Sequence, residues 1–434
     1  MTIADRVDAA APAAPLGVHS PLPSTVRPRF AGNRGDYWRL MIRGGALQAI
    51  TLGIYRFWLF TDARRFLWAS TEVRGEILEY TGTAVELLIG FLMAIGILVP
   101  VYALLFMASL ELGLISQGSG VVAFVVLAGF GQYAVFRARR YRLTRTVFRG
   151  LRFHQGGSAL RYAVRATLWW IPIIMTLGLA LPWATANLEH YKMRNTFYGN
   201  LGGGFAGCGG RLFWRVIVIW LLVVGPIVGG LAAAVTVSDW FAVPFEATIG
   251  GLSAIEEFSE RHELGLVLLL SGATGTVLAG FALYPAYQAI VMRWWLGGLR
   301  LGDATIASDL DMRRYYGAYL RFLLYVLLFS IAFFVVAGIV FGLGYVALRG
   351  QIDFGKSSLL RDGLTTATTI VTYVILILGY SAIYHVVVKL RLWQAAVESM
   401  LISNLAALDH VQATEATSSG VGEGLADALG TGGI

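Results

Sequence analysis

Six long runs without a charged residue constrain this chain more than any other feature of its sequence. A helix needs about twenty apolar residues to cross the ~30 Å hydrocarbon core of a bilayer, and each run exceeds that length. Lipid offers the backbone no hydrogen-bond partner, so such spans are expected to be helices. The chain is also 57% hydrophobic and only 14% charged, whereas soluble domains carry about 25% charged residues. We therefore predict a multi-pass membrane protein whose spans lie in 87–110, 112–136, 216–237, 264–292, 322–348 and 363–384.

The basic residues predict which side of the membrane each loop occupies. Thirty of the 34 Lys and Arg residues fall in six clusters, which are Arg6–Arg43, Arg56–Arg74, Arg137–Arg165, Lys192–Arg215, Arg293–Arg321, and Lys389 with Arg391. Basic loops stay on the cytoplasmic side because their translocation is disfavoured. All six clusters are cytoplasmic if the runs pair as three transmembrane helical hairpins, 84–136, 212–292 and 319–391. Both termini are then cytoplasmic.

Two further apolar segments do not fit this pattern as simple spans. Residues 44–55 give only twelve uncharged positions between Arg43 and Arg56, a length that suits an interfacial or re-entrant segment. Residues 166–188 are long enough to cross but contain two prolines, which disrupt a regular helix. We favour two re-entrant or additional short membrane segments. The alternative is eight spans, with both segments crossing and the Arg-rich 137–165 stretch outside.

The predicted fold class is an all-α polytopic membrane protein with six spans, the two short segments and small cytoplasmic β-hairpins. Its single cysteine, Cys208, excludes an internal disulfide. The organisation along the chain follows from the charge pattern and from the polar composition of both ends. It comprises a disordered N-terminal arm (1–29), a first re-entrant or amphipathic module (30–83), hairpin 1 (84–136), a basic cytoplasmic module with the second re-entrant segment (137–211), hairpin 2 (212–292), a cytoplasmic linker (293–318), hairpin 3 (319–391) and a cytoplasmic tail (392–434) that is disordered from about 412.

An internal repeat connects these modules. A cationic or aromatic pair is followed by a polar or small pair and then by a glycine, and such repeats show how a chain was built. The copies are Arg65-Phe66 with Ser70-Thr71 and Gly75, Arg140-Tyr141 with Arg145-Thr146 and Gly150, His190-Tyr191 with Asn195-Thr196 and Gly199, and a weaker Arg293-Trp294 with Gly298-Leu299 and Gly302. Residues 71–80 and 146–153 alternate around a turn-forming glycine, which predicts short β-hairpins.

These motifs resemble the repeated motif of the YjgN-type family of bacterial inner-membrane proteins, whose molecular function is not established. The resemblance covers roughly residues 30–410 and implies a location in the bacterial inner membrane; it supplies no catalytic residues. It rests on Leu52-Gly53-Ile54-Tyr55, Arg65-Phe66, 70–76, 79–83, Leu181-Pro182-Trp183 and Asn195-Thr196.

Motifs of enzyme chemistry receive no support from their context. Residues 202–207 match the dinucleotide pattern G-x-G-x-x-G, but that motif needs a βαβ unit and a membrane span follows it instead. The six histidines have no metal-ligand spacing, and no nucleophile–base arrangement is present. We predict no enzyme activity, no cofactor and no metal. Nucleic acid is not an expected partner, because the net charge of +8 lies where the topology would place it.

Polar groups within spans are the usual indication of function. Gln132, Gln288 and His385 each lie beside a tyrosine near the cytoplasmic end of a hairpin's second helix, and they could line one central polar cavity. The plainer interpretation is interhelical hydrogen bonding. The best functional hypothesis from sequence is a small-solute transporter or pore component.

The alternative hypothesis is a scaffold that binds anionic lipids, because arginines and aromatic rings at the ends of apolar runs lie at headgroup level. Membrane lipids are then the expected partners, and no oligomeric state is predicted. The candidate headgroup residues are Arg65, Arg140, Arg145, Arg293, Trp58, Trp183 and Trp294.

Overall fold

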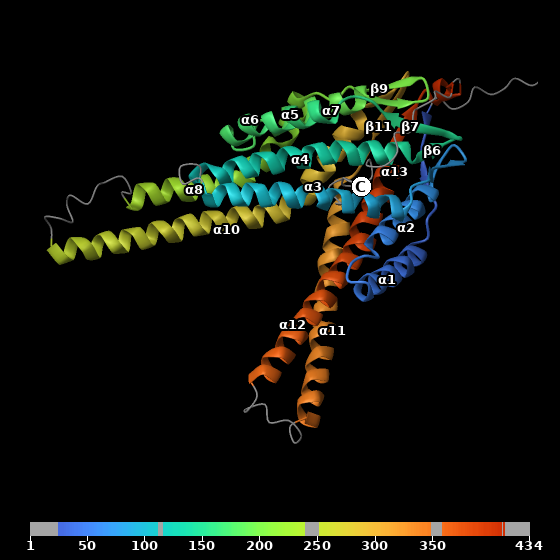
Figure 1. The fold of residues 1–434 in the computed structure, drawn as a ribbon. Helices are drawn as coiled ribbons and strands as arrows, with labels where there is room; N and C mark the ends of the chain where they lie inside the picture. Colours follow the sequence, from blue (N-terminus) through green and yellow to red (C-terminus); the bar gives the residue numbers. More distant parts are fainter. Residues whose placement is uncertain (1–24, 112–115, 239–250, 349–357, 410, 413–434) are drawn as a thin grey trace, which may run out of the picture.

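The computed structural model describes residues 25–111, 116–238, 251–348, 358–409 and 411–412 (Figure 1). Most of the N-terminal arm and nearly all of the tail from about 412, both predicted to be disordered, lie outside these residues. Residues 25–29 differ from the predicted arm. They form strand β1 (Thr25–Val26) and the start of β2 (Arg29–Phe30), because each finds a partner strand elsewhere in the chain.

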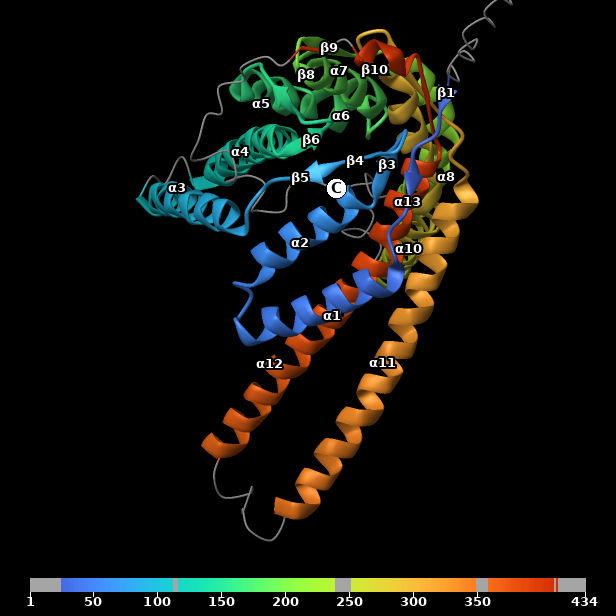
Figure 2. The same ribbon diagram turned by 90° about the vertical axis from the view of Figure 1, so that its right-hand side faces the viewer.

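Five helical pairs make up most of the described chain (Figures 1 and 2). Three pairs are long and two are short. Each pair leads into strands, so helix and sheet alternate along the sequence. The pairs are α1 (Arg34–Ile50) with α2 (Arg56–Ala69); α3 (Ala84–Glu111) with α4 (Ser116–Thr144); α5 (Ala159–Leu168) and α6 (Trp170–Met175) with α7 (Leu181–Arg194); α8 (Gly209–Ser238) with α10 (Gly251–Gly298); and α11 (Met312–Leu348) with α12 (Ser358–Ile383), the π-helix η1 (Tyr384–Lys389) and α13 (Leu390–Glu398).

Five helices among the described residues are long and apolar enough to cross a membrane. They correspond to five of the six predicted runs. The sixth run, 112–136, lies mostly on α4, but residues 112–115 are outside the described part of the chain. The candidate spans are Ala84–Leu104, Gly209–Val237, Glu263–Gly298, Met312–Gly344 and Thr366–Glu398.

The two short helical pairs share one backbone turn. Thr51 and Thr176 each donate a hydroxyl hydrogen bond to a carbonyl four residues earlier, at 2.8 and 2.6 Å. The same hydroxyls accept the backbone N–H four residues later, at 3.0 Å in both turns. The next residues, Leu52 and Leu177, have φ values of 51° and 48°. Each leucine precedes a glycine that also has positive φ, so segments 44–55 and 166–188 share a helix–turn–helix structure.

The described chain is mostly helical, as predicted, but its strands form a closed ring that the prediction of small β-hairpins did not include. Nine strands pair in the order β1-β12-β11-β10-β9-β8-β7-β6-β5, and β2, β3 and β4 form a second sheet. Only two residues separate β1 from β2, and one separates β4 from β5, so the two sheets join at both ends. The remaining strands are β3 (Thr71–Val73), β4 (Glu76–Ile77), β5 (Glu79–Tyr80), β6 (Thr146–Phe148), β7 (Leu151–Gln155), β8 (Thr196–Tyr198), β9 (Leu201–Phe205), β10 (Leu299–Leu301), β11 (Ala304–Ser308) and β12 (Met400–Ser403).

The predicted β-hairpins are confirmed as parts of this ring. Residues 71–77 form β3 and β4, and residues 146–155 form β6 and β7. Their two-residue turns are Arg74-Gly75 and Arg149-Gly150, all with positive φ. Two successive residues with positive φ fit the twist of a tight hairpin.

Apolar side chains from around the ring pack into one core. Val73, Phe148, Tyr198 and Ile402 come from four different strands and are all buried. Residues 405–409 and 411–412 cover this core, since Leu405 is also buried in it and Leu408 packs against it. Asp409 forms ion pairs with the turn residues Arg149 at 2.6 Å and Arg74 at 3.6 Å. Through Asp409, the C-terminal segment therefore contacts the turns of both the β3–β4 and the β6–β7 hairpins.

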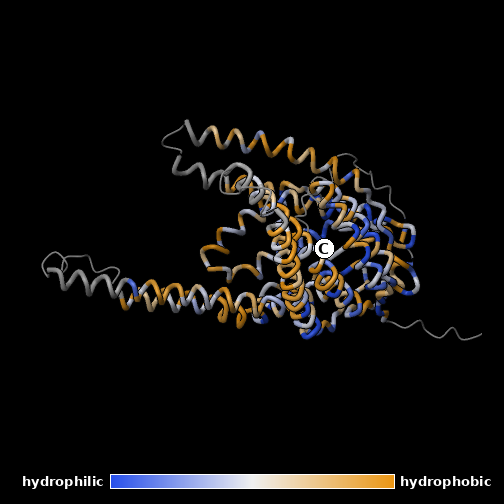
Figure 3. Tube along the Cα trace, turned by 90° about the horizontal axis from the view of Figure 1, so that it is seen from below, coloured by the Kyte–Doolittle hydropathy of each residue, from blue (hydrophilic) through white to orange (hydrophobic). Residues whose placement is uncertain are grey.

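The long helices project from the ring and are apolar along most of their length, whereas hydrophilic residues gather where the helices meet the strands (Figure 3). Helices α11 and α12 run in a different direction from α3, α4, α8 and α10 (Figure 1). Helices α8 and α10 approach closely at Gly230 and Gly272, where a Cβ on Gly272 would lie 2.5 Å from the Pro226 carbonyl oxygen. The small residues at this point therefore allow close helix packing.

Candidate functional site

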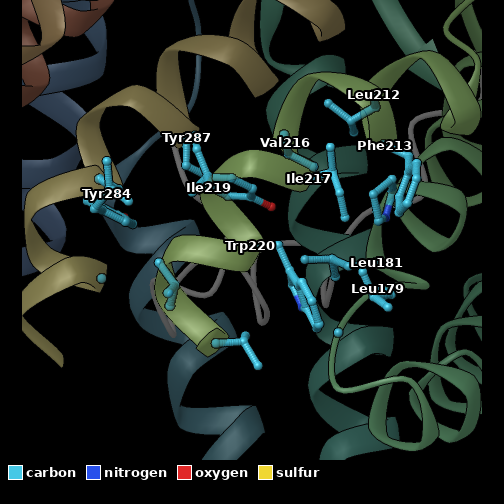
Figure 4. Close-up of a pocket in the computed structure, with 16 residues that line it drawn as sticks. Leu179, Leu181, Leu212, Phe213, Val216, Ile217, Ile219, Trp220, Tyr284 and Tyr287 are labelled. Carbon is cyan, nitrogen blue, oxygen red and sulfur yellow. The ribbon is translucent and has the colours of Figure 1, made fainter. Parts of the chain in front are cut away.

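An apolar groove lies between the second short helical pair and helices α8 and α10 (Figure 4). Its volume is about 240 Å³. Two candidate spans, Gly209–Val237 and Glu263–Gly298, form part of its lining. Its lining includes Leu179, Leu181, Phe213, Val216, Trp220 and Tyr287.

One hydrogen bond fixes the wall of this groove. The indole Nε1 of Trp220 on α8 donates to the carbonyl oxygen of Leu177 at 2.8 Å, which attaches the left-handed turn to α8. On the opposite wall, Gly280 of α10 has no atom within 4 Å of the place where a Cβ would stand. A side chain added at position 280 would therefore meet open space at the lining of the groove.

Basic and aromatic residues surround the end of α8 that lies nearest the strands. Arg211 and Arg215 are exposed and lie one helical turn apart, next to the groove residues Leu212 and Val216. Trp214 lies between the two arginines in the sequence and is 76% exposed. We call Arg211, Trp214 and Arg215 the basic collar of the groove. Cations and an aromatic ring at the end of an apolar surface are typical of the headgroup level of a membrane.

Helix α5 carries a second arrangement of this kind. Leu160, Val164 and Leu168 are spaced by four residues and are all exposed. Arg161 and Arg165 accompany them in the lining of a shallow cavity of about 630 Å³. An exposed apolar stripe with flanking arginines is typical of a helix that lies in the membrane interface.

The three predicted cavity residues lie on α4, α10 and η1. The Gln288 amide donates to the Tyr284 hydroxyl on its own helix. The His385 ring bonds the Ser381 carbonyl at 2.8 Å and stacks on Phe60 at 6.2 Å between centroids. Four cavities lined by described residues are the groove, the one at α5, one near Arg65 and one between α1 and α2, and none includes Gln132, Gln288 or His385 in its lining. A cavity shared by these three residues stays a prediction.

Three of the predicted headgroup arginines make intramolecular contacts. Arg65 donates to the Gly82 carbonyl at 3.0 Å. Arg140 donates to the Gly157 carbonyl at 2.5 Å. Arg145 pairs with the Glu86 carboxylate at 2.9 Å. Arg65 and Arg140 thus bind backbone carbonyls of nearby loops, and Arg145 joins the end of α4 to the first turn of α3.

The fourth arginine and the three tryptophans divide into accessible and buried groups. Arg293 is exposed, Trp183 is 42% exposed, and half-buried Trp58 stacks on Tyr55. Trp294 is only 3% exposed, and its Nε1 donates to the Cys208 carbonyl at 3.2 Å. The prediction of a headgroup role for Trp294 is therefore corrected, because its ring lies inside the junction of α8 and α10.

A buried charged group was missed by the sequence reasoning. Glu189 and Lys192 on α7 form an ion pair whose side chains are 11% and 15% exposed. Trp295 Nε1 donates to the other Glu189 oxygen at 3.0 Å. Arg139 of α4 lies alongside, with one guanidinium N–H donating to Met193 Sδ at 2.9 Å. Glu189 and Lys192 are three residues apart, but their other neighbours lie far away in the sequence.

Burial and charge act together on these groups. Burial alone would raise the pKa of the Glu189 carboxyl, but Lys192 and Arg139 hold it below its ordinary value. Burial lowers the pKa of the Lys192 ammonium, although Glu189 opposes that shift. Burial likewise lowers the pKa of the Arg139 guanidinium. Burial raises the pKa of the neighbouring Tyr162 to about 12. Desolvation is thus the largest influence throughout this junction.

Comparison with known proteins agrees with the repeat and the apolar helices. The chain is 22% identical over 344 residues to inner membrane protein YjgN of Salmonella typhimurium, which covers 77% of this chain and 75% of that protein. No solved structure matches the chain. A family model described as "Bacterial protein of unknown function (DUF898)" matches residues 25–428. The chain therefore belongs to the DUF898 family of bacterial proteins of unknown function.

Proposed function

We propose that this protein is a non-enzymatic, multi-pass protein of the bacterial inner membrane that binds anionic lipids. The observation that carries the proposal is the apolar groove of α8 and α10 with its collar of Arg211, Arg215 and Trp214. An acyl chain matches the apolar lining, and a phosphate headgroup matches the basic collar. Each exposed cation near an anionic lipid surface contributes about 1 kcal/mol to such binding.

The location is supported by the similarity to an inner membrane protein and by the candidate spans. We propose that three long helical pairs cross as hairpins, giving six spans, and that the two short pairs enter the membrane and return. The exposed turn residues Leu52 and Leu177 support the second part, since they are 95% and 62% exposed and would face acyl chains. The clusters of basic residues near the ring support cytoplasmic termini.

Lipid binding is preferred to solute transport on the position of the cavities. The groove is peripheral and apolar, so it suits a hydrocarbon chain. The polar groups of a solute would find no hydrogen-bond partners there, which is costly. A transporter would need a polar path near Gln132, Gln288 and His385, and these residues line none of the four cavities. Helix α5 adds to the lipid interpretation through its exposed apolar stripe.

Native mass spectrometry of the purified full-length protein tests this proposal. We expect the protein to retain anionic phospholipid in preference to phosphatidylcholine. Gly280→Phe would fill the groove and reduce that retention, since a side chain there meets open space. Gly338→Phe on α11 is the matched control, because it also meets nothing within 4 Å but lies away from the groove. Equal lipid retention by the two variants would overturn the proposal.

A further inference from the structure

The two short helical pairs can be compared position by position. A shift of 125 residues leads from Thr51 to Thr176 at the turn, and the same shift leads from Thr71 to Thr196 at the following strand. Thr71 and Thr196 also make the same hydrogen bond, since each hydroxyl donates at 2.8 Å to the carbonyl four residues earlier. Residues 125 positions apart therefore occupy equivalent places in the first pair (α1, α2) and the second pair (α5, α6, α7).

One such place carries a side-chain hydrogen bond in the second pair. The indole Nε1 of Trp169, at the end of α5, donates to the side-chain oxygen of Asn187 on α7 at 3.4 Å. The equivalent residues of the first pair are Gly44 on α1 and Asp62 on α2. Glycine has no side chain that could donate, so the first pair keeps an acceptor at position 62 without the donor that the second pair supplies.

Where the second pair has this indole, the first pair has a cavity. It lies between α1 and α2, and Gly44, Leu59 and Asp62 are part of its lining. Its volume is about 320 Å³. Asp62 is half-buried, and within the part of the chain that the structure describes it forms no ion pair and accepts no hydrogen bond. A carboxylate with free acceptor capacity therefore borders the cavity.

Two arginines of α1 line the same cavity. Arg39 and Arg43 are four residues apart, so they lie on one face of the helix. Both are exposed. Arg39 pairs with Asp36 at 3.7 Å, but an exposed ion pair of this kind contributes little and leaves the guanidinium available. The cavity thus has two cations on α1 and one anion on α2.

The position of the cavity suits a lipid headgroup. Figure 2 shows α1 and α2 side by side, with their turn at the end away from the strands. Ile50, Leu52 and Ile54 at this turn are exposed apolar residues, in keeping with the membrane insertion proposed above. Arg43 precedes Ile50 by seven residues, which is about 10 Å along a helix. A turn among the acyl chains therefore places the cavity near headgroup level.

We propose that the cavity between α1 and α2 binds the headgroup of phosphatidylethanolamine. The ammonium of this headgroup would donate to Asp62, as the Trp169 indole donates to Asn187. Its phosphate would accept from Arg39 and Arg43, since guanidinium groups are the usual partners of phosphate. A choline headgroup has no N–H to donate, and a glycerol headgroup has no positive charge. Asp62 would therefore select a lipid that carries an amine.

This inference goes beyond the proposed function, because both the helical pair and the class of lipid differ from those of the groove. It rests on the proposed insertion of the Leu52 turn and does not depend on α8 or α10.

Native mass spectrometry of the full-length protein with equimolar phosphatidylethanolamine and phosphatidylcholine of the same acyl chains tests the proposal. A hydrogen bond between charged groups corresponds to a preference of roughly tenfold for phosphatidylethanolamine. Asp62→Ala should abolish this preference. Asp303→Ala is the matched control, since it removes an exposed carboxylate from the β10–β11 turn and should keep the preference. A wild type without the preference, or an Asp62→Ala variant that retains it, would overturn the proposal.

Soluble phosphoethanolamine carries the same charged groups and distinguishes a lipid headgroup from a free ligand. In phosphatidylcholine nanodiscs, excess phosphoethanolamine should raise the Tm less than phosphatidylethanolamine in the bilayer does, because the acyl chains hold the lipid headgroup at high local concentration beside the cavity. An equal rise in Tm with the soluble compound would contradict a lipid site.

Gly280→Phe separates this inference from the proposed function. That variant should lose retained anionic lipid and keep its preference for phosphatidylethanolamine, whereas Asp62→Ala should do the reverse. Loss of the phosphatidylethanolamine preference in Gly280→Phe would show that the amine-bearing lipid binds in the groove, which would contradict a separate site between α1 and α2.

Discussion

Neutralising Glu189 is expected to destabilise the protein. Its carboxylate accepts from Lys192 and from Trp295, and its side chain is only 11% exposed. Removing one partner of a buried ion pair costs about 3–5 kcal/mol, because the other charge stays buried without compensation. Glutamine keeps an oxygen that can accept from Trp295. We therefore expect Glu189→Gln to lose about 3 kcal/mol of stability, the lower end of that range. At ~2 °C per kcal/mol this lowers the Tm by about 6 °C.

The assay is thermal unfolding of the purified protein. Glu398→Gln provides the matched control, since Glu398 pairs with Arg314 at 3.2 Å where the two side chains are 33% and 52% exposed. An exposed pair contributes about 0–1 kcal/mol, so the control should change the Tm by about 2 °C or less. Equal shifts for the two variants would refute the idea that burial makes the Glu189 pair costly to break.

The same pair predicts a pH dependence. The native pKa of Glu189 lies below its ordinary value, which is about 4.3 in an unfolded chain. A carboxyl with a lowered native pKa contributes stability above the unfolded value, and this is lost as the pH falls through the native value. The difference in Tm between wild type and Glu189→Gln should therefore be constant near pH 7 and shrink below about pH 4. A difference that grows on acidification would contradict this account.

The remaining predictions concern packing and the membrane. Gly272→Val should cost about 1–3 kcal/mol by overpacking, because its Cβ would meet the Pro226 carbonyl oxygen at 2.5 Å; the Tm should fall for this variant and stay constant for Gly342→Val, where nothing lies within 4 Å. Leu405→Ala removes a side chain that is 6% exposed and should cost about 2–5 kcal/mol; faster hydrogen exchange in residues 405–409 would check it, and unchanged exchange would contradict it. With Cys208→Ser as background, Leu52→Cys should resist a membrane-impermeant maleimide, and rapid labelling would refute insertion of this turn.

Local sequence patterns were sufficient for the helices and the hairpin turns. Uninterrupted apolar runs predict long helices because the backbone hydrogen bonds of a helix are made within the run itself and need no distant partner. The β-hairpins at 71–77 and 146–155 follow from alternation around Gly75 and Gly150, where a two-residue turn requires positive φ. Segments 44–55 and 166–188, which the sequence distinguished as two short apolar segments, share one turn at Thr51 and Thr176.

The ring and the buried charges depend on contacts that no local pattern contains. Thr25 on β1 pairs with Ser403 on β12, and almost the whole chain lies between them. The sequence near either residue therefore does not indicate that these two strands pair. Glu189 beside His190 resembles many exposed helix segments, and only the structure brings Trp295 and Arg139 to it. The burial of Trp294, which was predicted to reach headgroups, also depends on distant residues, because its ring contacts Phe205 and its Nε1 donates to Cys208.

The closure of the strand ring is the feature on which the arrangement of helices and charges depends, and cross-linking across β1 and β12 tests it most directly. In the Cys208→Ser background, Thr25→Cys with Ser403→Cys should form a disulfide in oxidised membranes, because the two residues face each other in the antiparallel register. Thr305→Cys with Ser403→Cys reports on the neighbouring β11–β12 pair and is the positive control. Cross-links in both pairs are the result that a closed ring predicts. A cross-link at Thr305 but none at Thr25 would show an open sheet and would contradict the convergence of the five helical pairs.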